Sequence, residues 1–137
     1  MAQTIHLEIV TPERKMLEAD VDRVEVPGLD GELGILPGHT ELLSQLKPAG
    51  LLTYHIGEEK HQIAISAGFV EVDPQHVTIL ADRAARPEDI DLTRALAMKE
   101  QAESLLQKSL TDPDVDADHA TTQLERAKIE LQLAGKG

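Results

Sequence analysis

Cysteine and tryptophan are absent from the sequence, and tyrosine and phenylalanine occur once each among its 137 residues. Without cysteine there is no disulfide framework, no thiolate nucleophile and no cysteine-ligated zinc site. Tyr54 and Phe69 are the only tyrosine and phenylalanine, so the chain has no stacking platform for single-stranded nucleic acid. The composition therefore excludes several classes of enzyme and nucleic-acid-binding protein.

Positive charge is also scarce, because 13 lysines and arginines face 25 aspartates and glutamates, for a net charge of −12. Such a chain repels nucleic-acid phosphates and anionic lipid, so we expect its partners to be proteins. No apolar run approaches the roughly 18 residues of a membrane span. Met1 is followed almost at once by the alternating segment TIHLEIV, so we expect no signal peptide and no transmembrane segment.

Up to residue 82 the hydrophobic pattern has a period close to two, which is typical of strands. Turn residues interrupt this pattern every several positions, and the segments 53–66 and 69–80 each read as a hairpin. Short strands between frequent turns predict an N-terminal all-β sandwich, a flattened barrel of about ten strands.

From ARPEDIDL onward the period becomes helical. We predict one helix over residues 88–110 and, after the breaker TDPDVD, a second helix that packs against it as an antiparallel hairpin. The predicted seam between them consists of Ala95, Met98, Ala102, Leu105, Ala117, Ala120, Leu124, Ala127, Leu131 and Ala134. The predicted fold class is thus α+β, with a sandwich over residues 1–86 and a regulatory helical hairpin over residues 87–137.

The alanine-rich seam bears on how firmly the hairpin is held. Burial contributes roughly 25 cal/mol per Å², and alanine offers little area, so the helices pack closely but weakly. We expect the hairpin to open or re-dock at a cost of a few kcal/mol, the scale on which conformational switches work. A static hairpin on a sandwich is the alternative.

Motifs for catalysis and metal binding are absent. The sequence has no HExxH, no G-x-S-x-G and no P-loop, and it predicts no metal site and no catalytic residue. Four positions of a calcium loop are matched by Asp114, Asp116, Asp118 and Glu125. His119, however, stands where such a loop needs glycine. We therefore predict a protein that is not an enzyme.

The segment GELGILPGHTELL, residues 31–43, combines three glycines and a proline with apolar residues that follow no regular period. Glycine permits positive φ and close backbone approach, whereas Pro37 excludes a helix. The segment is either a tight internal corner, with His39 hydrogen-bonded locally, or a surface shaped for a partner.

The segments TIHLEIVTPE, GELGILPGHTELL, SAGFVEV and VTILAD, followed by EDIDLTRA and a helical hairpin, closely resemble the epsilon subunits of bacterial F-type ATP synthase. The resemblance covers nearly the whole chain. It implies a non-catalytic rotor subunit of the central stalk that couples the proton-translocating c-ring to the catalytic head. The implied partners are the gamma subunit, the c-subunit ring, and the alpha and beta subunits of the head. The implied location is peripheral, on the cytoplasmic face of the bacterial inner membrane.

The resemblance also implies site residues in both parts of the chain. Glu32 and His39 match positions of the family's contact with the c-ring. In the family's ATP-binding motif, IDLTRA supplies Ile90, Asp91, Arg94 and Ala95. Ala85 and Gln101 stand where strong ATP binders carry glutamate and arginine, so any ATP would be a weak regulatory ligand and no other cofactor is expected. The alternative is that Asp91 and Arg94 serve only the start of the helix.

A further implied role is inhibition of ATP hydrolysis, in which basic residues of the hairpin meet the beta subunit. Lys108, Arg126 and Lys128 are the candidates in this chain. The helical part holds eleven acidic and six basic residues, so its net charge does not steer it toward an acidic surface. The alternative from another functional class is a free-standing ATP-sensing module.

Overall fold

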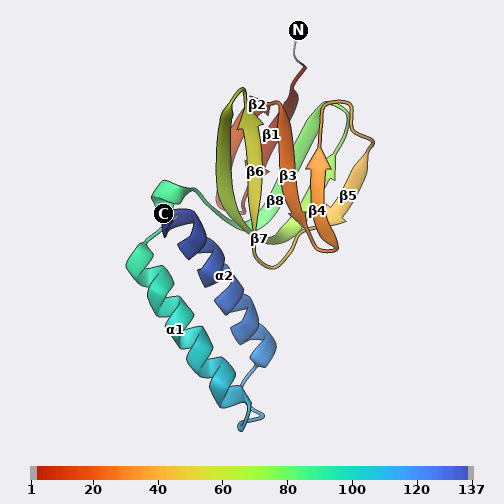
Figure 1. The fold of residues 1–137 in the computed structure, drawn as a ribbon. Helices are drawn as coiled ribbons and strands as arrows, with labels where there is room; N and C mark the ends of the chain where they lie inside the picture. The colour runs from red at the N-terminus through yellow and green to blue at the C-terminus, as the bar shows by residue number, and fades with distance from the viewer. Residues whose placement is uncertain (1–2, 136–137) are drawn as a thin grey trace.

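The computed structural model describes residues 3–135 and folds them into eight strands and two long helices (Figure 1). A single 3-10 turn, η1 (Pro87–Asp89), joins the strands to α1 (Leu92–Ser109), which is followed by α2 (Ala117–Gly135). The predicted fold class, a β-sandwich followed by an antiparallel hairpin, is confirmed. The strands are β1 (Ile5–Val10), β2 (Lys15–Val21), β3 (Arg23–Gly28), β4 (Gly31–Ile35), β5 (Leu42–Gln45), β6 (Gly50–Ile56), β7 (Glu59–Val72) and β8 (His76–Ala85).

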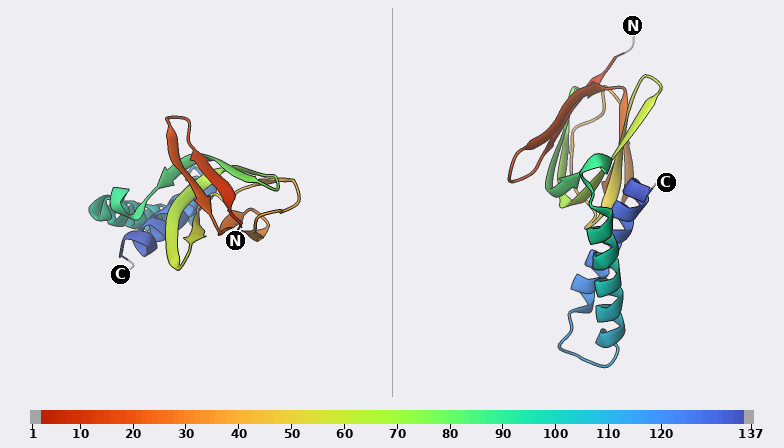
Figure 2. Two further views of the ribbon diagram at one scale, coloured as in Figure 1. Left: turned by 90° about the horizontal axis from the view of Figure 1, so that it is seen from above. Right: turned by 90° about the vertical axis from the view of Figure 1, so that its left-hand side faces the viewer.

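The strands form one sheet in the order β2-β1-β8-β7-β6-β3-β4, with β5 paired to β7 outside this path. β1 lies parallel to β8, whereas the other pairs are antiparallel. The two predicted hairpins are present as β6–β7 and β7–β8. Figure 2 shows the folded sheet from above and from the side, with the helical hairpin extending from one end.

The core of the sandwich is aliphatic and follows the period of two. Ile5, Leu7 and Ile9 of β1 are fully buried, and the residues between them are turned toward the surface. Leu52, Val70 and Ile79 are buried to the same degree on β6, β7 and β8. The alternation that predicted strands therefore also predicts which side chains face the core.

The sandwich has eight strands in the described part of the chain, fewer than about ten, in part because β7 serves twice. Its first half pairs with β6 and its second half pairs with β5. Between the halves, Ala67 has φ of 55° and Gly68 has φ of 112°. These two residues bend a single 14-residue strand where the pattern of turns suggested separate strands.

The first helix begins at Leu92, so its predicted start at residue 88 is wrong. Pro87 starts only the short turn η1, and Ile90 returns to an extended conformation. Asp91 then acts as the N-cap, because its carboxylate accepts the backbone N–H of Arg94 at 3.1 Å. Asp116 accepts the backbone N–H of His119 at 3.0 Å in the same manner before α2.

The alanine seam between the helices is confirmed at its centre: Ala95, Ala102, Ala120 and Ala127 are all at most 2% exposed. Ala117 is exposed, and the longer seam residues are only partly buried. The helices therefore meet most closely at their small side chains.

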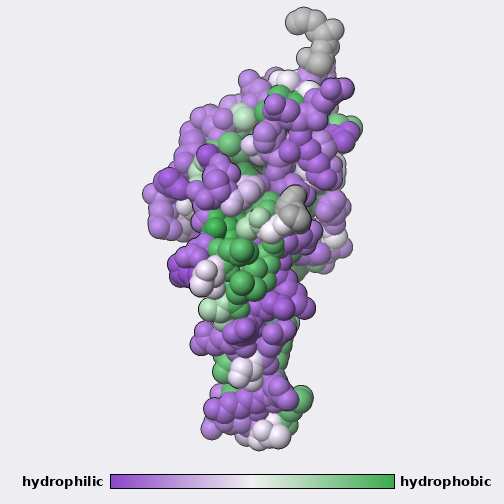
Figure 3. Space-filling model, turned by 60° about the vertical axis from the view of Figure 1, so that its left-hand side comes forward, coloured by the Kyte–Doolittle hydropathy of each residue, from purple (hydrophilic) through white to green (hydrophobic). Residues whose placement is uncertain are grey.

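The hairpin meets the sandwich near the C-terminal end of α2. Leu133 is buried there, and residues 131–135 line a pocket of about 1000 Å³ together with Tyr54 and Ile63. Figure 3 shows an apolar area on the surface around this junction, with hydrophilic residues over most of the rest of that face. The remainder of the hairpin projects away from the sandwich (Figure 1). Neither helix is long and apolar enough, within the described residues, to cross a membrane.

Candidate functional site

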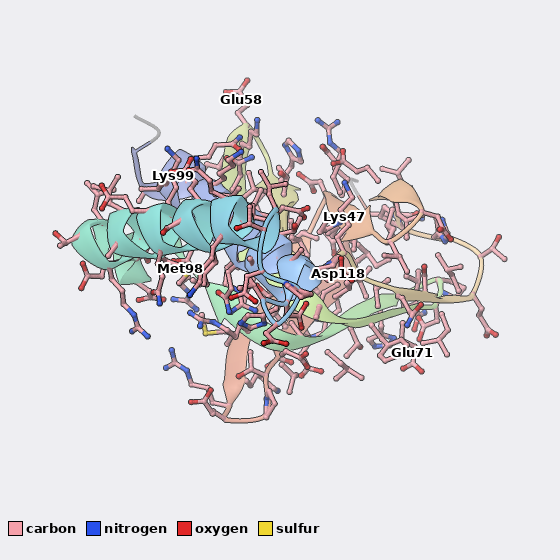
Figure 4. All side chains as sticks on the ribbon, turned by 90° about the horizontal axis from the view of Figure 1, so that it is seen from below. Lys47, Glu58, Glu71, Met98, Lys99 and Asp118 are labelled. Atoms are coloured by element: carbon pink, nitrogen blue, oxygen red, sulfur yellow. The ribbon has the colours of Figure 1, made fainter. Side chains whose placement is uncertain are left out.

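Three arginines from three elements line one pocket of about 430 Å³ between the sandwich and the hairpin: Arg83 of β8, Arg94 of α1 and Arg126 of α2. Polar side chains beside them are Gln101, His119 and Gln123, and an apolar floor is made by Ala97, Met98, Ala102 and Leu105. Figure 4 shows Met98 and Lys99 on opposite sides of α1, and of these two residues Met98 lines the pocket. A cationic end beside an apolar floor suits a ligand with a phosphate and an apolar ring. We call this site the arginine pocket.

Arg126 is the most constrained member of the arginine pocket. Its Nε is buried and has no hydrogen-bond partner within residues 3–135. Burial is the main cause that lowers the pKa of Arg126, and the positive charge of Arg83 lowers it further. The negative charge of Glu130 raises it. Arginine nevertheless stays protonated in proteins. An unpaired buried donor costs about 1–3 kcal/mol, so an anionic acceptor in the pocket would be favoured.

The residues of the IDLTRA motif do not all reach the arginine pocket. Arg94 lines it, whereas the Asp91 carboxylate caps α1 and Ala95 is buried in the seam between the helices. Of the two departures from the motif, Gln101 lines the pocket, but Ala85 lies in β8 opposite Ala64 and does not. Asp91 thus serves the start of the helix, as the alternative predicted, whereas Arg94 is placed where it could bind a ligand.

Lys108 and Lys128, two of the three residues predicted to meet the beta subunit, are exposed on the hairpin. Arg126, the third, lies in the arginine pocket. In this docked arrangement Arg126 is therefore separated from the two lysines, which are exposed.

Glu32 lies near the start of β4, whereas His39 lies in the loop beyond its end, because residues 31–35 of the segment GELGILPGHTELL form a strand. Glu32 pairs with Pro27 beside the β3–β4 turn. His39 lies in the loop after β4, where its Nδ1–H donates to the Thr40 carbonyl at 2.7 Å. The positive φ of Gly31 and Gly38 explains two of the glycines. The structure therefore does not bring the two predicted contact residues to one place.

An exposed apolar patch covers the outer face of the sheet at Leu43, Phe69 and Leu80, which are 68%, 45% and 48% exposed. Phe69 is directly opposite Leu80 across β7 and β8, and Leu43 is opposite Glu71 on the same face. Figure 4 shows Glu71 on the side of the sandwich remote from the hairpin. We call Leu43, Phe69 and Leu80 the outer patch.

Sequence reasoning missed the outer patch and Arg83. The patch had a signal, because alternation in SAGFVEV places Phe69 and the buried Val70 on opposite faces. Arg83 had none, because a single arginine on a strand is ordinary and only the docked hairpin brings Arg126 beside it. Within the described residues, no three histidine or acidic side chains are placed to hold a metal ion.

The fold and these sites define a class of protein: a small β-sandwich with an exposed apolar patch, joined to a helical hairpin, with a basic pocket between the two. The family model described as the ATP synthase delta/epsilon chain β-sandwich domain matches residues 4–87, and the one described as the long α-helix domain of the same chain matches residues 88–135. The chain belongs to the delta/epsilon chain family of ATP synthase.

Curated relatives match over their full length. The ATP synthase epsilon chain of Halalkalibacterium halodurans is 44% identical, with 97% of this chain and 98% of that protein covered. The ATP synthase epsilon chain of Syntrophobacter fumaroxidans is 45% identical, with 99% of each chain covered.

Solved structures agree in fold. A chain in the cryo-EM structure of the Euglena gracilis mitochondrial ATP synthase, in an assembly of OSCP, F1 and c-ring, gives a TM-score of 0.80 at 29% identity. That match covers 98% of this chain and 82% of the other. A chain of the Tetrahymena thermophila central stalk and c-ring structure gives a TM-score of 0.60 at 12% identity and supports the fold alone.

Proposed function

We propose that this chain is a non-catalytic rotor subunit of the central stalk of a proton-translocating ATP synthase, coupling the c-ring to the catalytic head. The observation that carries the proposal is the full-length match of both parts, in the same order, to epsilon chains of this complex. The subunit would be peripheral, held on the cytoplasmic face of the bacterial inner membrane by its partners.

The outer patch is where we place the gamma subunit. Three large apolar side chains exposed on adjacent strands form a surface that a monomer rarely leaves bare. The hairpin lies near the other half of β7, because residues 131–135 line one pocket together with residues 60–63, and the patch is exposed in the docked state.

Co-purification with the gamma subunit tests this placement. Leu80→Glu puts a charge in the outer patch, and Leu92→Glu makes the same change on α1 at an equal exposed fraction of 48%. We expect Leu80→Glu to abolish retention of the gamma subunit and Leu92→Glu to leave it intact. Equal retention by the two variants contradicts the placement, and loss of binding by both points to a different surface.

The arginine pocket supports a regulatory role for the hairpin. Because its residues come from β8, α1 and α2, a nucleotide held there binds only while the hairpin is docked, and so favours the docked state. Arg83, Arg94 and Arg126 would hold the phosphates, and Met98 and Leu105 offer an apolar surface to the base. When the hairpin undocks, Arg126 would become free to join Lys108 and Lys128 in inhibiting hydrolysis at the beta subunit.

Nucleotide binding alone would also fit a free-standing ATP sensor. The two functions differ in what they need: a stalk subunit binds the gamma subunit tightly without nucleotide, whereas a sensor does not. Co-expression with the gamma subunit, followed by purification in nucleotide-free buffer, separates them. A stable complex under these conditions is the expected result, and recovery of the chain alone rejects the stalk function.

A further inference from the structure

A carboxylate of the protein itself, Glu130, forms an ion pair with one of the arginines that line the arginine pocket. Glu130 of α2 lies 3.7 Å from the Nη2 of Arg83, and its side chain is only 13% exposed. It stands one helical turn after Arg126, on the same face of α2. Its charge raises the pKa of Arg126, against the lowering effects of burial and Arg83. Glu130 therefore already neutralises part of the positive charge that a bound phosphate would meet.

The ion pair between Arg83 and Glu130 is weak enough for a stronger hydrogen-bond acceptor to displace Glu130. A separation of 3.7 Å is longer than a hydrogen bond, so the carboxylate holds Arg83 by charge alone. Arg83 itself is 48% exposed and also lines the pocket, so it is accessible to a ligand. Phosphate oxygens accept short, charge-assisted hydrogen bonds from a guanidinium, which are stronger than such a distant pair.

We propose that Glu130 is a built-in competitor for the phosphate group of a nucleotide at Arg83, and that it sets the nucleotide affinity of this chain. The proposal rests on the proposed nucleotide site and adds two residues to it. Without ligand, Glu130 pairs with Arg83 and links the hairpin to the sandwich. With ligand, the phosphate takes Arg83, and Glu130 opposes binding by competing for that guanidinium.

The exchange keeps the hairpin docked in both states. Arg83 belongs to the sandwich, whereas Glu130 and the other two arginines belong to the hairpin. The Arg83–Glu130 pair bridges the two parts in the free protein, and a phosphate shared by the three arginines bridges them in the complex. Without the Glu130 charge, the bound phosphate is therefore expected to be the link between the hairpin and Arg83 of the sandwich.

The test is a double-mutant cycle on the full chain, with binding of ATP and of tripolyphosphate measured by titration calorimetry. Glu130→Gln is expected to tighten binding of both ligands about tenfold, the effect of one charge-assisted contact. Arg83→Gln is expected to weaken it, and adding Glu130→Gln to that variant is expected to give no such gain. Glu103→Gln is the matched control, because it removes an equal charge from α1 at a residue paired only with Lys99 among the ion pairs of the described residues.

Each outcome decides the proposal. Unchanged or weaker binding by Glu130→Gln overturns the proposal and assigns Glu130 a purely structural role. A gain in affinity that persists in the Arg83→Gln background overturns the exchange of Glu130 for phosphate at Arg83. Equal gains in Glu103→Gln and Glu130→Gln reduce the effect to net charge. Absence of binding in every variant rejects the nucleotide site itself, and binding that is indifferent to Glu130 rejects only the competitor. Should Glu130→Gln fail to melt cooperatively, Glu130→Asp, which withdraws the carboxylate from Arg83, is expected to show a smaller gain.

Discussion

Arg86, at the junction of sandwich and hairpin, donates a hydrogen bond of 2.5 Å from its guanidinium to the backbone carbonyl of Met16 in β2. The two residues are 70 positions apart in the sequence. The bond fixes the point at which the chain leaves the sandwich, so the hinge lies beyond Arg86.

Deleting everything after Arg86 should therefore leave a folded sandwich. The truncated chain keeps the Arg86–Met16 bond and the aliphatic core, and loses mainly the contacts of α2 and η1 with the sheet. We expect cooperative melting and retention of the gamma subunit, measured by circular dichroism and co-purification. An unfolded fragment would show that the hairpin is part of the sandwich's stability.

Gly68 should be the least replaceable glycine in the sandwich. A Cβ at this position would lie 2.0 Å from the Leu80 carbonyl oxygen, and its φ of +112° is strained for any other residue. We expect Gly68→Ala to lower the free energy of unfolding by about 3 kcal/mol or more.

Gly34→Ala is the matched control for that change, because a Cβ added at Gly34 would meet no other atom within 4 Å and its φ is not in the left-handed region. Its effect is expected to stay within about 0.5 kcal/mol. Denaturant titration of both variants checks the pair, and equal stability would contradict the bend assigned to β7.

Glu32 and His39 should be separable in their effects on coupling, because Glu32 lies near the start of β4 and His39 lies in the loop beyond its other end. Replacing both by alanine is expected to leave melting of the isolated subunit intact and to weaken proton pumping by the assembled enzyme. Each single variant then shows which end carries the contact. Normal pumping by the double variant counts against both residues, and a collapsed melting curve would make them structural.

ATP affinity should respond to the two departures from the binding motif. We expect weak binding by the wild type, loss of binding in Arg94→Ala, and tighter binding when Ala85→Glu and Gln101→Arg are combined. Each new charge-assisted bond contributes roughly 1.5–3 kcal/mol, or about ten- to a hundredfold in affinity. Gln101→Arg should act more strongly alone, since Gln101 lines the arginine pocket and Ala85 does not. Calorimetry that detects no heat in any variant, with the hairpin folded, would remove ATP as a ligand.

His6 should make stability depend on pH. Hydrogen bonds to Asp20 at 2.8 Å and to Glu18 at 2.7 Å raise its pKa above the usual 6.5, and the bond from His6 is the main cause that lowers the pKa of Glu18. The stabilisation by charged His6 is complete below pH 6.5 and is lost as the pH rises through the raised pKa of His6. The stabilisation by ionised Glu18 is lost as the pH falls through the lowered pKa of Glu18. His6→Gln should therefore cost more stability at about pH 6 than at about pH 8.5. A melting difference that does not vary with pH would contradict a charged His6.

Local patterns in the sequence were enough to determine the fold class. The alternation around Ile5, Leu7 and Ile9 predicts a half-buried strand because side chains of a strand point to opposite faces in turn. The three-to-four spacing of alanines predicts the helix seam for the corresponding reason in a helix. Both signals arise from residues a few positions apart, so a single sequence contains them in full.

The features that bring distant residues together were decided only by the tertiary structure. The bend at Gly68 merges two expected strands because its backbone packs against Leu80 from the neighbouring strand. Arg83, Arg94 and Arg126 form one pocket because the end of α2 docks on the sheet. Nothing local in the sequence specifies that docking, since it depends on the shape of two surfaces that exist only once each part has folded.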